Sequence, residues 1–526
     1  MKSKASKFIK PIALIISVMT ALLMLFSCGE DLPEITEIGE KSMTVSYDQK
    51  EVRVNYLKDP APINEKEKEK FFNVLDFGAT GDGVTDDTEA CRRALSVVDN
   101  GGTVYFPGGT YLVTDQLCIP GDNVTLRGDG NATKIVYTKV QDGSPLENQS
   151  LIGLESGISN ITVRDLHMEY HGEFFEEEGQ SYSGQINCIY FLEAHKVLVE
   201  NVEINGFNHT GVYVAGSGSA YATDITVRDC YLHHNRVGGV LYGFVDGILL
   251  ENNIMEYHGS EKDGGTGYGS AGYSGALPIN IRVLNNEANY NYRKGIDLHA
   301  GENAVIEGNT CRGNRLYGIY VEGPRTNHII IKNNVICDMN YETALYDMIY
   351  GIAIGTDNDG ISGRYYDYQI IGNIIDNFSL SNGRAYAIGC YPSFEIGKIT
   401  IKDNIINCGT VYFLIDLGED FNGQNISFII DGNQMYAEEV VYPNPAIRVV
   451  YYNSLIFTNN MIEINSQDMR TVTLVNKNDD SVTVVTGNTV ISKSKQSPIN
   501  ISLTRPPKCV IRENNIIIVK ESEGEQ

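Results

Sequence analysis

Two neighbouring stretches of this 526-residue chain carry side chains that can transfer protons and hold an anion. The first reads Lys-Gly-Ile-Asp-Leu-His over residues 294–299, and the second reads Tyr-Gly-Ile-Tyr-Val-Glu over residues 317–322. A histidine changes its charge near neutral pH and suits a base, and a nearby cation stabilises negative charge that builds on a substrate. The residues predicted to be catalytic are Asp297, His299, Tyr320 and Glu322, and those predicted to bind substrate are Arg293, Lys294, Arg315 and Tyr317.

Apolar and polar residues alternate in both stretches, which is typical of a strand with one buried face. Ile296 and Leu298 are expected to face the core, so Asp297 and His299 face outward. Adjacent strands of a sheet lie about 4.8 Å apart, so the equivalent outward pair of the second stretch would join them in one patch.

The pattern recurs along the chain at the period of a solenoid. The last polar residue before an apolar pair stands at positions 286, 309, 334, 373, 404, 433, 460, 488 and 515, with spacings from 23 to 39 residues. One turn cannot bury its own apolar face, so stacking must supply the core. The recurrent Asn or Gly is expected at a tight bend, where Asn also hydrogen-bonds along the stack. The Gly/Ser/Tyr-rich stretch 257–277 predicts a long loop, and earlier turns place Tyr213 and Leu241 at the Asp297 position.

The stretch NVLDFGATGDGVTDDT, followed by GGTVYFPGGTY, begins the repetitive part of the chain. Thr85 is the expected N-cap of a helix that has Asp86 and Asp87 in its first turn. The two stretches resemble the N-terminal block of the pectate-lyase-like superfamily, in the branch named for rhamnogalacturonases and epimerases. The resemblance implies an all-β fold, a single right-handed parallel β-helix with an N-terminal capping helix. Asp82, Asp86 and Asp87 are expected to brace turns and the helix start.

The Gly-Ile-Asp-Leu-His run also resembles the Asp-Pro-His motif of alginate C5-epimerases, whose Asp and His take part in catalysis. Carried over by position, the resemblance assigns catalysis to Asp297 and His299. Leu298 replaces the proline, and Lys294 stands where the epimerases have a catalytic tyrosine, which Tyr320 or Tyr317 could supply.

The implied chemistry is removal of the proton α to a uronate carboxylate, followed by reprotonation in an epimerase or loss of the 4-O-linked sugar in a lyase. His299 or Tyr320 would be the base. Lys294, Arg293 or Arg315 would hold the carboxylate. The expected substrate is an acidic or pectin-like extracellular polysaccharide.

Two other functions stay open. A glycoside hydrolase needs two carboxylates, and Asp297 and Glu322 would lie roughly 8 Å apart, within the range for inversion through a water molecule. The chain lacks the Gly-His-Gly and Arg-Ile-Lys motifs that polygalacturonase-type β-helix hydrolases carry. The other alternative is a non-catalytic glycan-binding surface protein.

The N-terminus reads as a targeting segment, with four lysines followed by the apolar run PIALIISVMTALLMLF, Ser27 and Cys28. It resembles a bacterial lipoprotein signal peptide, which implies cleavage before Cys28, lipidation of that cysteine and tethering to the outer membrane in the cell envelope. The expected divisions are a signal peptide at 1–27, a tether at 28–70 and the β-helix at 71–520, with its cap and first turns at 71–130.

The net charge of −26 makes nucleic acid an unsuitable partner, because phosphate binding needs a clustered basic surface. A polyanionic substrate therefore has to meet a local basic spot. We expect a monomer.

No metal site is predicted, and no cofactor is certain. His233 and His234 are adjacent on an expected strand and would point to opposite faces. Residues 357–360 look like part of a calcium loop without its closing acidic residue, so a turn explains them better, although Ca²⁺ bridging protein and uronate is kept as an alternative. Nine cysteines follow Cys28 without metal-type spacing, and Cys311 and Cys337 are candidates for a disulfide.

Overall fold

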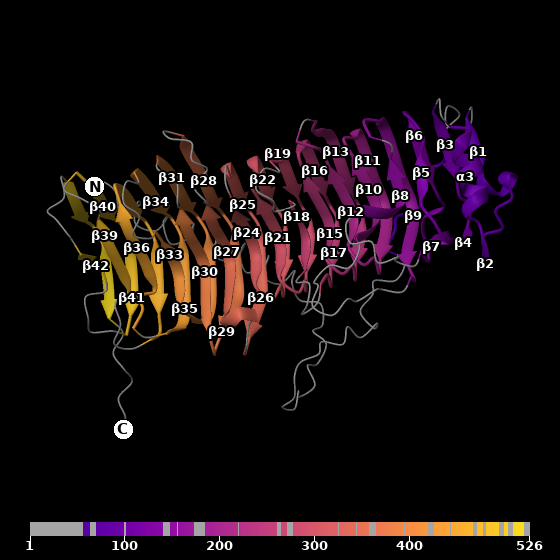
Figure 1. The fold of residues 1–526 in the computed structure, drawn as a ribbon. Coiled ribbons are helices and arrows are strands. Elements are labelled where there is room, and N and C mark those ends of the chain that lie inside the picture. The colour runs from indigo at the N-terminus through magenta and orange to yellow at the C-terminus, as the bar shows by residue number, and fades with distance from the viewer. Residues whose placement is uncertain are drawn as a thin grey trace, which may run out of the picture. The chain divides into compact units, whose positions relative to one another are not determined.

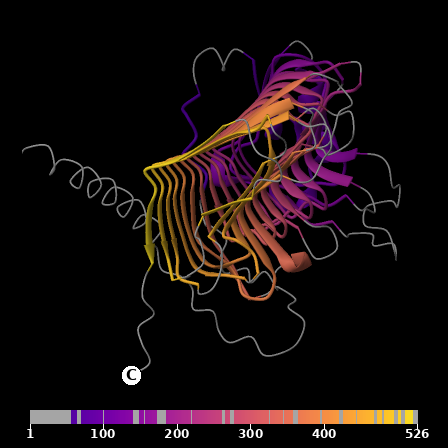
Figure 2. The same cartoon turned by 90° about the vertical axis from the view of Figure 1, so that its left-hand side faces the viewer.

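Strands stack in two parallel sheets, turn upon turn, in the computed structural model of the chain (Figure 1). The structure describes residues 56–63, 70–98, 101–139, 148–154, 156–172, 185–218, 220–259, 265–270, 277–323, 326–342, 345–356, 364–392, 396–418, 425–441, 443–466, 471–476, 480–493, 499–502 and 509–519. These residues belong to one unit, Arg53–Gln526. In the repeated part each turn gives one strand to a 14-stranded sheet, here sheet B, and two to a 30-stranded sheet, here sheet A. Figure 2 shows the strands of successive turns lying behind one another.

Sheet B carries the predicted site, and its strands are joined in the order of the chain. Its strands are β5 (Leu117–Ile119), β8 (Asn148–Leu154), β10 (Gln185–Leu192), β12 (Thr210–Ala215), β15 (Gly238–Gly243), β18 (Thr266–Ser270), β21 (Lys294–His299), β24 (Tyr317–Glu322), β27 (Met348–Thr356), β30 (Arg384–Pro392), β33 (Phe413–Leu417), β36 (Ile447–Tyr452), β39 (Val472–Asn476) and β42 (Ile499–Ser502).

Sheet A forms the rest of each turn. Its strands are β1 (Phe71–Asn73), β2 (Asp82–Asp86), β3 (Gly102–Tyr105), β4 (Gly109–Val113), β6 (Val124–Arg127), β7 (Thr133–Tyr137), β9 (Ser159–Tyr170), β11 (His195–Asn205), β13 (Ala222–Arg228), β14 (Tyr231–His233), β16 (Val245–Glu251), β17 (Ile254–Glu256), β19 (Ile279–Leu284), β20 (Glu287–Asn289), β22 (Glu302–Glu307), β23 (Thr310–Arg312), β25 (Asn327–Lys332), β26 (Val335–Tyr341), β28 (Tyr365–Ile371), β29 (Ile374–Leu380), β31 (Ile396–Lys402), β32 (Ile405–Val411), β34 (Asn425–Asp431), β35 (Gln434–Val440), β37 (Ser454–Thr458), β38 (Met461–Ile464), β40 (Val482–Thr486), β41 (Thr489–Ser492), β43 (Cys509–Glu513) and β44 (Ile516–Val519). The helical segments are η3 (Val74–Phe77), α3 (Thr88–Ser96), η4 (Gly130–Ala132) and η5 (Leu345–Asp347).

Identical positions of successive turns stack in register, which builds the core. In sheet B one inward column consists of isoleucine alone for six turns, each residue buried: Ile296, Ile319, Ile352, Ile388, Ile415 and Ile447. Burying a side chain of this size stabilises the fold by roughly 1.5–3 kcal/mol. The predicted parallel β-helix is therefore confirmed, and the alternation of each strand sends every second residue outward.

A buried asparagine ladder runs along one bend of the stack. Asn373 donates from its backbone N–H and its Nδ2 to Asn404 Oδ1, at 2.9 and 3.0 Å, and its own Oδ1 accepts the same pair of bonds from Asn334. All nine predicted repeat positions, from 286 to 515, are joined in this way. The left-handed bend falls one residue earlier than predicted, as at Gly372 with φ of 65°, which explains the repeated Gly-Asn pairs.

The N-terminal cap differs from the prediction in where its helix begins. Helix α3 starts at Thr88, because Thr85 still belongs to strand β2 and gives its hydroxyl to Asp82. Asp86 accepts bonds from Thr88, and Asp87 accepts from the backbone N–H groups of Thr80 and Gly81. The three aspartates brace turns and the helix start, as expected.

Three further predictions are corrected by the structure. The expected loop 257–277 contains strand β18, which pairs with β15 and β21. Tyr213 and Leu241 share the column of Asp297, as predicted, and Gly269 of β18 lies between Leu241 and Asp297. Cys311 and Cys337 are not joined in a disulfide. His233 ends strand β14 while His234 adopts a left-handed bend, so the two rings meet at 2.8 Å between their Nδ1 atoms and do not diverge.

Several predicted segments lie outside the described residues, including the signal peptide at 1–27, Cys28, most of the tether and the calcium-like run at 357–360. Part of the expected tether, residues 56–63, is described. There Leu57 is buried, and the backbone of Lys58 exchanges two hydrogen bonds with the side chain of Asn201. Within the described ranges, the helices are too short or too polar to cross a membrane.

The asparagine ladder yields a stability prediction. Asn373→Ala leaves the buried N–H of Asn334 and the carbonyl of Ile331 without their partners, so we expect a loss of about 2–3 kcal/mol in the free energy of unfolding, measured by urea titration. Asn407→Ala is the matched control, because Asn407 is exposed and bonds only across the surface to Asp376, and it should cost at most about 0.5 kcal/mol. Equal losses in the two variants would contradict the role of the ladder.

Candidate active site

Strands β21 and β24 lie side by side in the predicted register. Asp297 pairs with Tyr320 and His299 pairs with Glu322, while Ile296 is buried on the opposite face of β21. The alignment of the two stretches is confirmed. The four residues predicted to be catalytic thus occupy one patch on the outward face of sheet B.

The polar side chains of this patch form a continuous line of opposite charges. Lys294 Nζ lies 2.6 Å from Asp297 Oδ2, and Asp297 Oδ1 lies 3.0 Å from His299 Nδ1. The other ring nitrogen of the histidine, Nε2, lies 3.0 Å from Glu322 Oε2. Lys294 and Asp297 are buried, whereas the side chains of His299 and Glu322 remain 24% and 34% exposed. A ligand on this face would therefore meet His299 and Glu322 first.

His299 is held in its charged form. Burial alone lowers the pKa of the imidazole, but hydrogen bonds to Asp297 and Glu322 outweigh it and raise this pKa to about 9. At neutral pH both ring nitrogens then carry protons, and His299 is a proton donor. The expectation that it serves as a neutral base needs this revision, because both of its nitrogens already face carboxylates.

The two carboxylates stay ionised. Burial raises the pKa of Asp297, but the charge of Lys294 and the hydrogen bond from His299 bring it below its ordinary value. Burial also raises the pKa of Glu322, but hydrogen bonds from His299 and Tyr320 outweigh it, so this pKa is lowered as well. The line therefore carries two positive and two negative charges, which lets it lie in a partly buried place.

Tyr320 closes the patch above this line. Its ring packs edge-on against His299, with centroids 5.9 Å apart, and Lys294 Nζ lies 4.5 Å from its centroid. Tyr317 stacks on Tyr320 at 4.2 Å. Burial and the hydrogen bond to Glu322 raise the pKa of Tyr320 far above its ordinary value, so its hydroxyl keeps its proton at neutral pH.

The flanking basic residues separate into two groups. Lys294 joins the patch, as described above. The guanidinium of Arg293 lies 5.9 Å from the ring of Tyr346, and that of Arg315 lies 4.7 Å from the ring of Tyr292. The structure thus brings Lys294 and Tyr317 to the patch and turns Arg293 and Arg315 towards aromatic rings at the bends.

A second charged group on the same sheet was not found from the sequence. It comprises Tyr391, Asp416 and Arg448, and Asp416 and Arg448 lie further along the outward column that contains Asp297. The signal was present, because the runs Ala-Ile-Gly-Cys at 387–390 and Leu-Ile-Asp-Leu at 414–417 extend the alignment of Gly-Ile-Asp-Leu-His.

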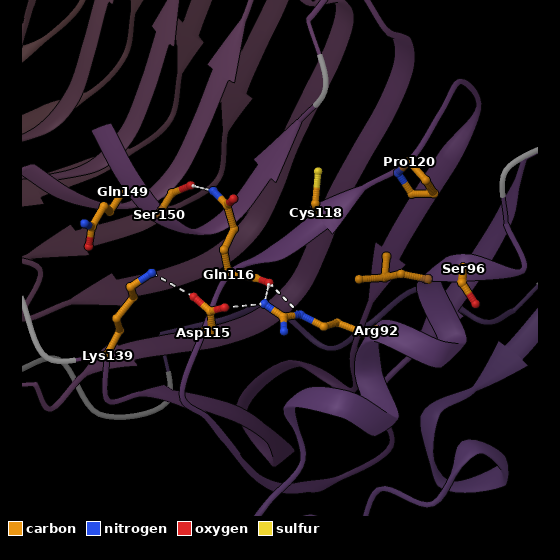
Figure 3. A pocket seen from close by; sticks show the side chains of 10 residues that line it. Arg92, Ser96, Asp115, Gln116, Cys118, Pro120, Lys139, Gln149 and Ser150 are labelled. Carbon is orange, nitrogen blue, oxygen red and sulfur yellow. Dashed lines mark hydrogen bonds and ion pairs between the residues drawn. The ribbon is translucent and has the colours of Figure 1, made fainter. Parts of the chain in front are cut away.

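A pocket of about 510 Å³ lies at the N-terminal end of sheet B, beside helix α3 (Figure 3). Asp115 lies 2.6 Å from Arg92 and 2.7 Å from Lys139, so one carboxylate is shared by the two cations of the lining. Cys118 lines this pocket and shares the column of Asp297, six strands away. No histidine is among its described lining residues, so we place the acid–base chemistry at β21 and β24 instead. Across the described part of the chain, no group of three or more His, Cys, Asp or Glu side chains is arranged to hold a metal ion.

Comparison with known proteins agrees with this architecture. The family model described as rhamnogalacturonase A/epimerase, pectate lyase-like, matches residues 71–238, and one for the right-handed β-helix region matches residues 156–336. The chain is similar to alginate lyase 7 of Azotobacter vinelandii, with 31% identity over 199 residues, or 36% of this chain and 22% of that protein. It is also similar to mannuronan C5-epimerase AlgE6 of the same organism, with 28% identity over 193 residues, or 35% of this chain and 21% of that protein.

A solved structure extends the likeness in fold over most of the chain. The tailspike protein of E. coli bacteriophage HK620 matches with a TM-score of 0.53 and 13% sequence identity, over 86% of this chain and 79% of that one. The aligned regions span only about a fifth of the length of the two curated relatives.

The charge of His299 gives a pH prediction. Its pKa in the folded protein lies above the ordinary value of 6.5, so its contribution to stability is full below pH 6.5 and is lost as the pH rises to about 9. We expect wild type to exceed His299→Gln by about 2–3 kcal/mol in the free energy of unfolding at pH 6, with little difference left at pH 9.5. Urea titrations at both pH values check this, and a difference that grows with pH would contradict it.

Proposed function

We propose that this chain, a pectate-lyase-like right-handed β-helix protein, acts on a polysaccharide at C5 of its uronate residues, as a lyase or a C5-epimerase. The observation that carries the proposal is the line Lys294, Asp297, His299 and Glu322 with Tyr320 packed above it. Such a set supplies both positive charge and exchangeable protons at one exposed point. The names of the two curated relatives include both reaction types.

Removal of the C5 proton leaves negative charge on the neighbouring carboxylate, so the reaction requires a cation there. His299 is the more exposed of the two cations, with 24% of its side chain accessible, whereas Lys294 is buried against Asp297. We assign His299 to the substrate carboxylate side of the reaction and Lys294 to holding Asp297 in place. Asp297 in turn orients the imidazole through Nδ1.

Proton transfer can be balanced with the groups present. The C5–H bond breaks and its proton passes to the oxygen of Tyr320, while Tyr320 gives its own proton to Glu322. The imidazolium of His299 then donates its Nε2 proton, either to the opposite face of C5 in an epimerase or to the departing O4 in a lyase. Neutral His299, whose pKa of about 9 lies above that of Glu322, then takes up the new proton of Glu322 across 3.0 Å. The site is thereby reset without another residue.

A glycoside hydrolase is the second candidate, because the patch contains two carboxylates. In the structure the imidazole of His299 lies between Asp297 and Glu322, bonded to both, where an inverting enzyme needs a water molecule. This arrangement favours C5 chemistry. A protein that only binds glycans is the third candidate, and it is separated from the others by the absence of any product.

The place of action remains part of the proposal. A lipid on Cys28, after cleavage of residues 1–27, would hold the protein at the outer membrane. The β-helix would then meet polysaccharide outside the cytoplasm.

Kinetics of variants test the proposal. With oligomers of mannuronate as substrate, we expect His299→Gln and Asp297→Asn to lower turnover by about 10²–10⁴-fold, because each removes a group of the proton-transfer line. His328→Gln is the matched control, since this histidine is exposed at the start of β25 in sheet A, and its turnover should equal that of wild type.

Three readouts on the same samples identify the reaction. Ultraviolet absorbance from a new double bond indicates a lyase, deuterium incorporation at C5 without cleavage indicates an epimerase, and new reducing ends alone indicate a hydrolase. Full activity in both site variants would refute the site. Binding of the oligomer by wild type without any of the three products would refute the enzymatic function.

A further inference from the structure

The second charged group of sheet B is built around a fully buried carboxylate. Arg448 Nε and Nη2 lie 2.6 and 2.7 Å from the two oxygens of Asp416, and the hydroxyl of Tyr391 donates to Asp416 at 3.0 Å. Asp416 is 1% exposed, whereas the side chain of Arg448 is 40% exposed. The guanidinium also lies 4.9 Å from the ring centroid of Phe413. Asp416 thus binds one edge of the guanidinium and Phe413 packs against one of its faces, while the rest of the Arg448 side chain is open to solvent.

An arginine held in this way is suited to bind an anion. A guanidinium has five N–H donors in a planar fork that matches a carboxylate, and the two bonds to Asp416 use two of them. Because its position is already set, little side-chain entropy is lost on binding. Asp416 balances the charge of Arg448, so a polyanion would be bound here through the N–H donors that Asp416 does not use rather than through a net positive charge.

A row of stacked rings connects this group with the candidate active site. One column of sheet B places Tyr317, Tyr350, Tyr386 and Phe413 in succession after Lys294. Successive ring centroids are 5.2, 4.5 and 5.8 Å apart. The row therefore starts with Tyr317, which stacks on Tyr320 of the candidate active site, and ends with Phe413, whose ring contacts the guanidinium of Arg448.

Small residues between the two groups let these rings lie across the sheet. The outward column that links Tyr320 to Asp416 contains Ala353 and Gly389. A Cβ at Gly389 would meet the rings of Tyr350 and Tyr391 at 3.0–3.2 Å, so the rings cover the backbone there. Tyr317 and Tyr350 remain partly exposed, whereas Tyr386 and Phe413 are buried, so a sugar ring would contact the exposed edges of these two tyrosines.

We infer that this surface binds further units of an acidic polysaccharide, with the partly exposed Tyr317 and Tyr350 beside the sugar rings and Arg448 on a uronate carboxylate. Asp416 lies three strands from Glu322 and four from Asp297, so the carboxylate of Asp416 is about 14–19 Å from these residues of the candidate active site. The uronate carboxylate bound by Arg448 would lie at least this far from the reacting unit. The inference rests on the proposed function in taking the polymer to be acidic. It adds that the chain runs along the stack towards the C-terminal turns.

Calorimetric binding tests the inference separately from catalysis. The full-length protein carries Tyr320→Phe, which removes the hydroxyl that the proposed chemistry needs, and is titrated with a mannuronate hexamer and with its carboxyl-reduced, neutral counterpart. Adding Arg448→Gln should raise the Kd for the acidic hexamer about tenfold or more, because a charge-assisted bond is lost, and should leave the neutral hexamer unaffected. Arg448→Lys keeps a charge beside Asp416 but loses the fork, so it should weaken acidic binding as well.

Arg228→Gln is the matched control. Arg228 is 43% exposed and paired with Glu200, but it lies on β13 of sheet A, so this change should leave both affinities unaltered. Circular dichroism shows whether each variant is folded, and Arg448→Lys serves if Arg448→Gln is not.

Equal affinity for the acidic hexamer in the parent and in a folded Arg448 variant would overturn the inference, as would a parent that does not bind this hexamer. Arg448-dependent binding by a wild-type protein that forms no product would support the subsite and refute the proposed reaction. Turnover by the wild type, together with binding that Arg448→Gln leaves unchanged, would support the proposed reaction and refute the subsite.

Discussion

In-register stacking of parallel strands is the constraint on which the rest of this structure depends. Because the side-chain period of a strand is two, every turn must place the same positions inward and outward. Isoleucine fills one inward column of sheet B over six turns, and the asparagine ladder joins nine successive turns through amides that are mostly buried. Any outward residue is consequently placed within about 4.8 Å of its counterparts in the neighbouring turns. A functional surface on this fold therefore consists of columns of outward residues from successive turns.

The candidate active site shows how charge is accommodated on such a surface. Lys294 and Asp297 are buried, which is costly for either one alone, but they are bonded to each other and to His299. The next turn contributes Glu322, which completes the neutral set. Neither strand alone supplies the environment that keeps His299 protonated, and the raised pKa is a property of the stacked pair.

Much of this could be predicted from sequence because the repeat is explicit. The nine asparagine positions and the alternation in β21 and β24 led to the fold and to the pairing of Asp297 with Tyr320. Strand β18 was missed because its Gly-Tyr-Gly-Ser run has no apolar alternation, and its place in the sheet comes from the backbone bonds of its neighbours. The charge of His299 depends on carboxylates on both sides, one of them from another turn. Where the side chains of Arg293 and Arg315 point depends on the backbone at the bends before β21 and β24, which strand alternation does not predict. Asp416 and Arg448 were missed because turn lengths vary, so the asparagine spacing does not set the alignment of sheet B.

The central claim is that a uronate polymer reacts on the outward face of sheet B at β21 and β24. A crystal structure of the Asp297→Asn variant with a bound mannuronate hexamer tests it most directly. The account predicts the hexamer along sheet B, with C5 of one unit beside Tyr320 and its carboxylate beside His299. A hexamer bound in the pocket beside helix α3, or on sheet A, would contradict it.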